Sequence, residues 1–297
     1  MGKIFDALEK AGKEPAKPDR SRKIDSPVRK KIVPLEKKGR DRAGNRNLKG
    51  KKPSPELKTD LADTAIDKQL ICALKPRSFE AEQFKMLRTK LLFPAEGEAP
   101  RTIMVTSGVP GEGKSFVAAN LAVSIAQNIN KHVLLMDCDL RMPSLGRTFG
   151  IETAAGLSEY LADGLTVPDL LCKTVIDKLT ILPAGQPPAN PAELLSSEKM
   201  FDLLEDVKTR YQDRYVIVDL PPPNLTSEAH AIARRVDGII LVIRQGMSSR
   251  KIIAGLVDML GEKKILGVVF NGVDTQSFGY GGYGKYGKYG DYSYGKE

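Results

Sequence analysis

A glycine-rich segment in the first half of the chain has the residue types and spacing of a phosphate-binding loop. It reads Gly-Val-Pro-Gly-Glu-Gly-Lys-Ser over residues 108–115, with an apolar stretch at 103–106 before it and a helical pattern at 115–126 after it. Such a loop closes backbone N–H groups around phosphates at the start of a helix, and its lysine and hydroxyl serve the terminal phosphates and Mg²⁺. A chance glycine turn fits this context poorly. The residues expected to bind ATP are Gly108, Gly111, Glu112, Gly113, Lys114, Ser115 and Phe116.

Three aspartates follow two further apolar runs. Asp137 and Asp139 come at the end of Leu-Leu-Met-Asp-Cys-Asp, and Asp219 ends Tyr-Val-Ile-Val-Asp. Alone, the first pair would be read as a helix cap beside a solvated carboxylate. Beside a phosphate site, one carboxylate can hold magnesium while another accepts the proton of a nucleophile. The residues predict a site for Mg-ATP chemistry.

The elements that position these residues are short apolar runs that alternate with helical stretches. The expected strands are 101–108, 131–137, 178–185, 214–222, 238–245 and 265–273. Apolar strands separated by helices indicate an α/β fold with a mostly parallel central sheet covered on both faces. Ligands of such sheets bind at the carboxyl ends of the strands. The predicted domain covers residues 71–275 and is of the P-loop NTPase class.

The N-terminal part differs in composition from the rest. Residues 1–60 contain 19 Lys and Arg against 9 Asp and Glu, whereas the remaining residues contain 27 against 28. Residues 1–12 place Ile4, Phe5, Leu8 and Ala11 on one face of a short amphipathic helix, which docks either on its own domain or on a membrane-bound partner. Residues 13–70 predict a basic disordered linker that could also attract anionic lipid or an acidic partner. Nucleic-acid binding is disfavoured because residues 1–60 contain a single aromatic residue, whereas a surface that stacks bases needs several.

Composition also restricts where the protein works. The longest apolar run is residues 239–243, far short of the roughly 18–20 residues that span a bilayer. No signal peptide is visible, and Cys72, Cys138 and Cys172 have no disulfide or metal spacing. These features predict a cytoplasmic protein in a reducing compartment.

The last residues, 276–297, hold six of the nine tyrosines among glycines. Such a segment cannot form a packed core and predicts a flexible tail. A flexible tail can deliver its hydroxyl groups to an active site as phosphate acceptors. The acceptor tyrosines are Tyr280, Tyr283, Tyr286, Tyr289, Tyr292 and Tyr294.

The loop, the aspartate motifs and the tyrosine tail together resemble the bacterial tyrosine kinases of capsule and exopolysaccharide synthesis. The start, MGKIFDALEKAG, resembles the branch found with exosortase-linked polysaccharide loci. The resemblance implies that Lys114, Asp137, Asp139 and Asp219 are catalytic, with Asp137 as the base for the tyrosine hydroxyl. It assigns magnesium to Ser115, Asp139 and Asp219. By analogy with related P-loop proteins, Asn271 approaches the adenine.

The resemblance also implies partners. The family has a Glu-x-x-Arg-x-x-Arg helix that builds rings, and Glu82, Lys85 and Arg88 occupy that place here, with lysine in place of the first arginine. Lysine keeps the charge but loses the planar fork of hydrogen-bond donors. A membrane polysaccharide co-polymerase is the expected activator, which would hold the chain at the inner face of the membrane. The expected substrates are protein tyrosines, including those of the tail.

Two other functions remain open from the sequence. A positioning or partitioning ATPase of the same superfamily would hydrolyse ATP as a switch, but such proteins carry a second lysine where this chain has Val109. A scaffold with a degenerate site is disfavoured because all five expected catalytic side chains are present. Formation of phosphotyrosine separates the kinase from both.

Overall fold

The computed structural model describes residues 66–152, 154–209 and 213–273. The predicted helix at 1–12 and tail at 276–297 lie outside these residues, as does most of the predicted linker at 13–70. The described structure begins five residues before the predicted domain start at 71. Leu70 is fully buried there, and the N–H of Asp67 donates to the carbonyl of Thr148.

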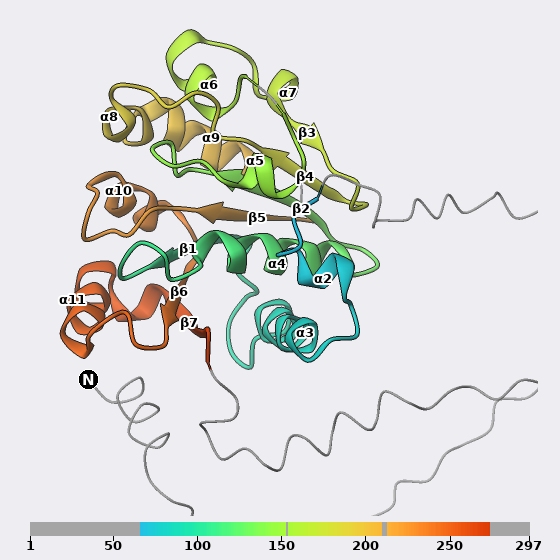
Figure 1. The fold of residues 1–297 in the computed structure, drawn as a ribbon. Coiled ribbons are helices and arrows are strands. Elements are labelled where there is room, and N and C mark those ends of the chain that lie inside the picture. The colour runs from blue at the N-terminus through green and yellow to red at the C-terminus, as the bar shows by residue number, and fades with distance from the viewer. Residues whose placement is uncertain (1–65, 153, 210–212, 274–297) are drawn as a thin grey trace, which may run out of the picture. The chain divides into compact units, whose positions relative to one another are not determined.

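A seven-stranded sheet forms the centre of the domain (Figure 1). Its strands are β1 (Thr102–Ser107), β2 (His132–Asp137), β3 (Cys172–Lys173), β4 (Leu179–Leu182), β5 (Arg214–Asp219), β6 (Gly238–Arg244) and β7 (Ile265–Asn271). Their order is β3-β4-β2-β5-β1-β6-β7, and only the β3–β4 pair is antiparallel. The mostly parallel α/β sheet predicted from the apolar runs is confirmed.

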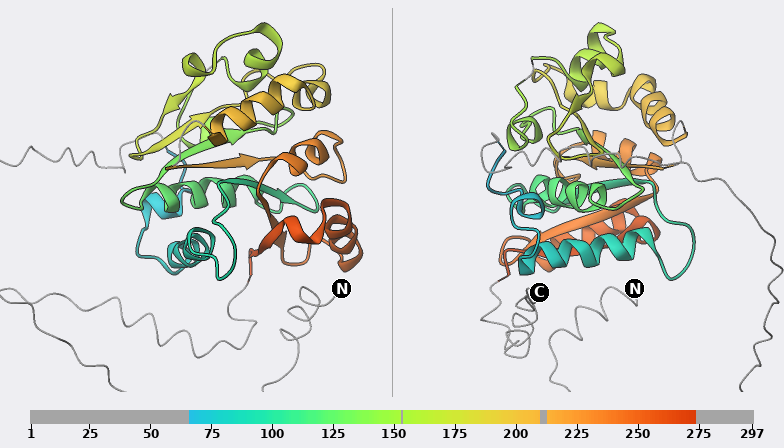
Figure 2. Two further views of the ribbon diagram at one scale, coloured as in Figure 1. Left: turned by 180° about the vertical axis from the view of Figure 1, so that it is seen from behind. Right: turned by 90° about the vertical axis from the view of Figure 1, so that its right-hand side faces the viewer.

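Helices cover both faces of the sheet, as the two views in Figure 2 show. One buried cluster packs β1, β2 and β5 against α2 (Ile71–Leu74), α3 (Phe79–Leu92), α4 (Lys114–Ala126) and α5 (Leu145–Thr148). The second packs the opposite strand faces against α6 (Leu157–Asp163), α7 (Val167–Leu170), α8 (Pro191–Leu195), α9 (Glu198–Thr209), α10 (Glu228–Arg235) and α11 (Arg250–Leu260). The 3₁₀ turn η2 (Glu262–Lys264) precedes β7. Because both faces are buried, the inner strands consist of continuous apolar runs rather than alternating ones.

Register aligns the carboxyl ends of the central strands. Asp137 pairs with Asp219 between β2 and β5, and Val105 pairs with Asp219 between β1 and β5. The loop that follows β1 therefore starts at the same edge of the sheet as both aspartates. Within the described ranges, no helix combines the length and the apolar character that crossing a bilayer requires.

Candidate active site

The phosphate-binding loop joins β1 to α4 at the carboxyl edge of the sheet. Gly111 and Gly113 have φ values of 84° and 92°, which only glycine adopts without strain. Gly113 is the N-cap of α4 and provides no side-chain cap, so the first N–H groups of the helix have no side-chain acceptor at this position. Such a helix start attracts anions through its free N–H groups and its dipole.

Lys114 lies between two carboxylates at the floor of the loop. Its Nζ is 2.7 Å from Oδ2 of Asp139, 3.8 Å from Oδ1 of Asp219 and 3.3 Å from Oγ of Ser115. Burial on its own would lower the pKa of Lys114, but the carboxylates of Asp219 and Asp139 outweigh burial and raise it. The side chain is therefore a fixed positive charge at the place where the terminal phosphates of a nucleotide would lie.

Asp137 is held by the loop that follows β2. Its Oδ2 accepts the N–H groups of Ser144 and Leu145 at 3.1 and 3.0 Å, and its Oδ1 accepts that of Asp139 at 3.2 Å. Burial, with the negative charge of Asp219 nearby, raises the pKa of Asp137 to about 7. An ionised carboxylate has about four lone-pair sites, and three of them accept these N–H groups, so one site on Oδ1 remains for a further hydrogen bond or a proton. Its geometry and pKa suit a base that acts near neutral pH.

Asp219 is the most deeply buried carboxylate of the group. It is fully buried, and neither of its oxygens accepts a hydrogen bond from a described residue. Burial raises its pKa, and the charge of Lys114 opposes this effect. An orphaned carboxylate beside the Ser115 hydroxyl fits a cation with few protein ligands. Mg²⁺ is commonly held in this way, by one or two protein oxygens and the phosphates of its substrate.

Asp139 has no free carboxylate oxygen in this arrangement. Oδ2 contacts Lys114, and Oδ1 accepts the N–H of Met142 at 3.1 Å. Among the described residues, no group of three or more His, Cys, Asp and Glu side chains could form a metal cage by itself. The predicted metal ligands Ser115 and Asp219 are thus brought together, whereas Asp139 is paired with the lysine.

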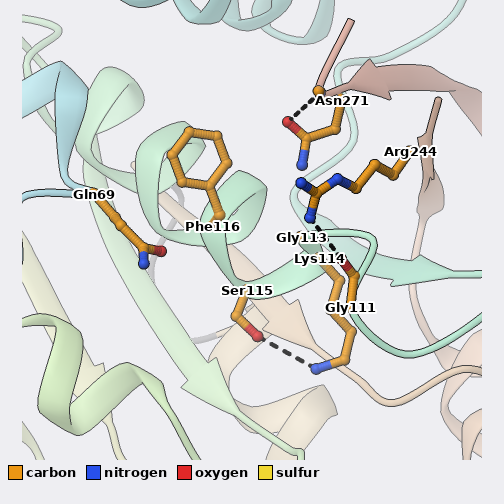
Figure 3. A pocket seen from close by; sticks show the side chains of 9 residues that line it. Gln69, Gly111, Gly113, Lys114, Ser115, Phe116, Arg244 and Asn271 are labelled. Atoms are coloured by element: carbon orange, nitrogen blue, oxygen red, sulfur yellow. Dashed lines mark hydrogen bonds between the residues drawn. The ribbon is translucent and has the colours of Figure 1, made fainter.

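A pocket of about 480 Å³ opens beside the loop (Figure 3). The predicted residues Phe116 and Asn271 line it. The ring of Phe116 packs edge-on against the ring of Phe84, with 5.9 Å between the ring centroids. Three further lining residues, Gln69, Arg244 and Gly272, were not predicted from the sequence. Arg244 is the last residue of β6, and a charged residue directly after an apolar run is the signal that could have revealed it. Gln69 lies before α2 and has no such signal.

The side chain of Glu112 accepts hydrogen bonds from the loop itself and from β6. It is fully buried, and Oε2 accepts the N–H groups of Gly108 and Val109 at 2.7 and 3.1 Å. Its Oε1 accepts the N–H of Arg244 at 3.2 Å. The carboxylate therefore fixes the start of the loop against β6, and only its backbone remains available for phosphate.

Comparison with known proteins agrees with this site. Residues 98–276 match the ParA family model, described as NUBPL iron-transfer P-loop NTPase. The chain is 35% identical over 209 residues to the tyrosine-protein kinase YwqD of Bacillus subtilis, covering 70% of this chain and 87% of that protein. The chain belongs to the bacterial tyrosine kinases. This membership confirms the predicted family and the P-loop NTPase fold, and the family implies nucleotide binding.

Solved structures of bacterial tyrosine kinases are similar as well. The chimeric protein CapA2B2 matches with a TM-score of 0.65 and 31% identity over 71% of this chain and 93% of that one. The kinase domain of Escherichia coli tyrosine kinase ETK matches with a TM-score of 0.63 and 30% identity, over 76% and 84%. Tyrosine-protein kinase Wzc of Salmonella typhimurium is 31% identical over 71% of this chain, which corresponds to 29% of its own length.

The remaining predicted residues lie away from the active site. Glu82 and Lys85 pair with each other along α3 at 2.6 Å, and Arg88 donates to the carbonyl of Ser124 on α4 at 2.8 Å. All three belong to one helix, as their spacing predicts. The six tyrosines predicted to accept phosphate, within residues 280–294, fall outside the described residues.

Proposed function

We propose that this protein transfers the terminal phosphate of Mg-ATP to tyrosine hydroxyls, including those of its own residues 280–294. The observation that carries the proposal is the placement of Asp137 beside the phosphate loop, next to the Lys114, Asp139 and Asp219 cluster. A phosphate loop alone serves hydrolysis and transfer equally. Transfer to a tyrosine also requires a base near the loop that can accept the proton of the acceptor hydroxyl.

The residues divide the work of the reaction. Lys114 neutralises charge that develops on the transferred phosphoryl group, and the N–H groups at the start of α4 hold the phosphate chain. Ser115 and Asp219 would hold Mg²⁺, which when bound neutralises the phosphate oxygens. Asp137 accepts the proton of a tyrosine hydroxyl whose ordinary pKa is about 10. Because phosphoryl transfer needs little covalent help, positioning and charge suffice.

Breaking of the Lys114–Asp139 contact accompanies this cycle. The 2.7 Å ion pair occupies the lysine in the present structure. Bound ATP phosphates would compete with Asp139 for Lys114, and an Asp139 freed from the lysine could then help to hold Mg²⁺. This exchange reconciles the expected metal role of Asp139 with the contact seen here.

Incubation with Mg-ATP tests the kinase activity. We expect several phosphate additions in the intact mass, mapping to residues 280–294, and none in Lys114→Met. Lys263→Met is a matched control, because Lys263 is exposed at the opposite end of the sheet. Release of ADP without phosphotyrosine, also in the presence of cell membranes that supply an activator, would contradict the kinase function. It would favour the switch ATPase, which the ParA family match keeps as the second candidate.

The cellular role follows from the family. We propose that the kinase regulates exopolysaccharide or capsule synthesis, acts as a ring-shaped oligomer, and is held at the membrane by a separate polysaccharide co-polymerase. The similarity to the tyrosine-protein kinase Wzc and to the chimeric protein CapA2B2 supports this role. Flotation with membranes of the source cells, but not with protein-free vesicles of the same lipids, tests the protein partner. Flotation with both would instead indicate direct lipid binding.

A further inference from the structure

The outer turn of the phosphate loop, residues 111–113, is held by side chains from the ends of two strands. The carbonyl of Gly111 accepts Nη1 of Arg244 at 3.4 Å, and the carbonyl of Glu112 accepts Nδ2 of Asn271 at 2.8 Å. Arg244 ends β6 and Asn271 ends β7. Figure 3 shows both side chains on the same side of the pocket, opposite Gln69.

These two contacts restrict where the neighbouring N–H groups point. A trans peptide is planar, so the carbonyl oxygen of one residue and the N–H of the next lie on opposite sides of the chain. The described part of the chain contains no cis peptide bond. When the carbonyls of Gly111 and Glu112 face β6 and β7, the N–H groups of Glu112 and Gly113 face away from those strands. That is the side on which phosphate is expected, because Lys114 and the start of α4 follow directly.

The orientation of the Asn271 amide is fixed from its other end. Its Oδ1 accepts the N–H of Gly272 at 2.9 Å, which leaves Nδ2 as the atom that faces the loop. The packing is close, since a Cβ added to Gly113 would collide with Nδ2 of Asn271. The buried carboxylate of Glu112 adds a third link by accepting the N–H of Arg244. The turn is therefore held by hydrogen bonds to the carbonyls of Gly111 and Glu112 and by the carboxylate of Glu112.

We propose that Asn271 and Arg244 are positioning residues of the phosphate loop, which aim the N–H groups of Glu112 and Gly113 at the phosphates of the nucleotide. The competing role is direct contact with the base, because both side chains also line the pocket. The inference rests on the proposed function only for the identity of ATP as the phosphate donor. The two roles differ in the part of the nucleotide whose binding each one affects.

Tripolyphosphate, which has no base, separates the two roles. We expect Asn271→Leu, similar in size but without a donor, to weaken the binding of tripolyphosphate and of ADP about five- to tenfold, as the loss of one hydrogen bond predicts. Asn271→Ala removes the same donor with a smaller side chain, and it should weaken the binding of both ligands by a similar factor. Asn190→Leu makes the same change at an exposed position before α8 that does not line the pocket, and it should leave tripolyphosphate binding unchanged. Titration calorimetry on the full chain measures each affinity, and thermal unfolding verifies that each variant is folded.

Arg244 needs a charge-matched comparison. Arg244→Lys keeps the charge and one donor, so it should bind tripolyphosphate more tightly than Arg244→Met. The Asn271 variants decide the proposal, because they remove no charge. Unchanged tripolyphosphate affinity in both would overturn it, whether or not ADP binding weakens. Absence of tripolyphosphate binding by the unaltered chain would overturn it too. Failure to form phosphotyrosine would contradict the proposed kinase function but leave these binding comparisons intact.

Discussion

At the scale of the residue, the site depends on how differently three buried aspartates are satisfied. Asp137 accepts three backbone N–H groups, and Asp139 accepts one and contacts Lys114. Asp219 forms a longer ion pair of 3.8 Å with Lys114, and neither of its oxygens accepts a hydrogen bond from a described residue. A buried polar group without a partner is costly, and such groups persist mainly where a ligand completes them. The three side chains can therefore have three different roles although they are of one type.

The base role of Asp137 gives a direct test. We expect Asp137→Asn to lower the rate of tyrosine phosphorylation about 10²- to 10⁴-fold, since an amide cannot accept the proton. ADP binding and thermal unfolding are measured alongside, because the amide NH₂ would face a backbone N–H group that the carboxylate now accepts and could displace the loop after β2. Asp177→Asn, an exposed position before β4, is the matched control. Phosphotyrosine formation at the normal rate in Asp137→Asn would exclude this residue as the base.

At the scale of the element, one ion pair ties the loop after β2 to the start of α10. Arg141, half exposed, contacts Glu228, which is 1% exposed, at 3.3 Å. The pair joins the loop that follows β2 to the helix that follows β5. An arginine that holds a buried carboxylate fixes its own loop in place as well.

We expect Arg141→Met to reduce the free energy of unfolding by about 1.5–3 kcal/mol, because it leaves the Glu228 carboxylate buried without a counter-charge. Adding Glu228→Gln to that variant should restore part of the loss, since a neutral amide is less costly to bury. Urea unfolding of the two single variants and the double variant measures this coupling. Additive losses in the double variant would show that the two side chains do not interact.

Asp237 precedes β6 and links the amino end of β1 to α9, at the end of the strands opposite the phosphate loop. It accepts the N–H groups of Arg101 and Thr102 at 2.9 and 3.0 Å, and Nζ of Lys208 on α9 at 2.6 Å. Burial on its own would raise the pKa of Asp237, but these hydrogen bonds outweigh burial and lower it. A carboxyl group with a lowered pKa in the folded state stabilises that state above its unfolded pKa of about 3.9, and the contribution is lost as the pH falls through the folded value.

Replacement of this carboxylate should therefore have a pH-dependent effect. We expect Asp237→Asn to lower the free energy of unfolding by about 1.5–3 kcal/mol at neutral pH. The difference from the unaltered chain should shrink as the pH falls from about 5 toward 3. Chemical unfolding across this range measures both. A difference that is constant over the whole range would rule out a charge effect.

Prediction from sequence succeeded for elements that carry their signal locally. The strands before Gly108, Asp137 and Asp219 were predicted because each is an apolar run that ends in a polar residue. The antiparallel β3 was not, since two residues, Cys172 and Lys173, form no pattern. The order of the strands, and the meeting of Arg244 and Asn271 with the phosphate loop, depend on pairings between distant segments. No local pattern encodes those.

At the scale of the whole molecule, the candidate ring helix is already engaged within one chain. Lys85 pairs with Glu82 and also donates to the carbonyl of Pro76 at 2.8 Å, while Arg88 holds α4. Assembly by these side chains would have to compete with their internal contacts. We therefore expect a ring whose stability responds to modest changes in charge.

Phosphorylation is such a change. Each phosphate on residues 280–294 adds about −1.5 to −2 charge, and several on one segment repel one another and any shared surface. We expect the phosphorylated chain to sediment as a smaller species than the Lys114→Met chain at equal concentration. Velocity sedimentation of both samples at low and high salt measures the effect, which salt should weaken. An identical sedimentation coefficient would show that phosphate does not control assembly.

The position of β7 has a consequence for how such proteins diverge. Among the described residues, this strand lies at the margin of the sheet and pairs with β6 alone, and the tyrosine segment follows it in the sequence. Residues added or deleted after Asn271 disturb no pairing of the inner strands. If the tail tyrosines are the acceptors that we propose, their number and spacing can change during evolution without altering the pairing of the strands that carry the active site.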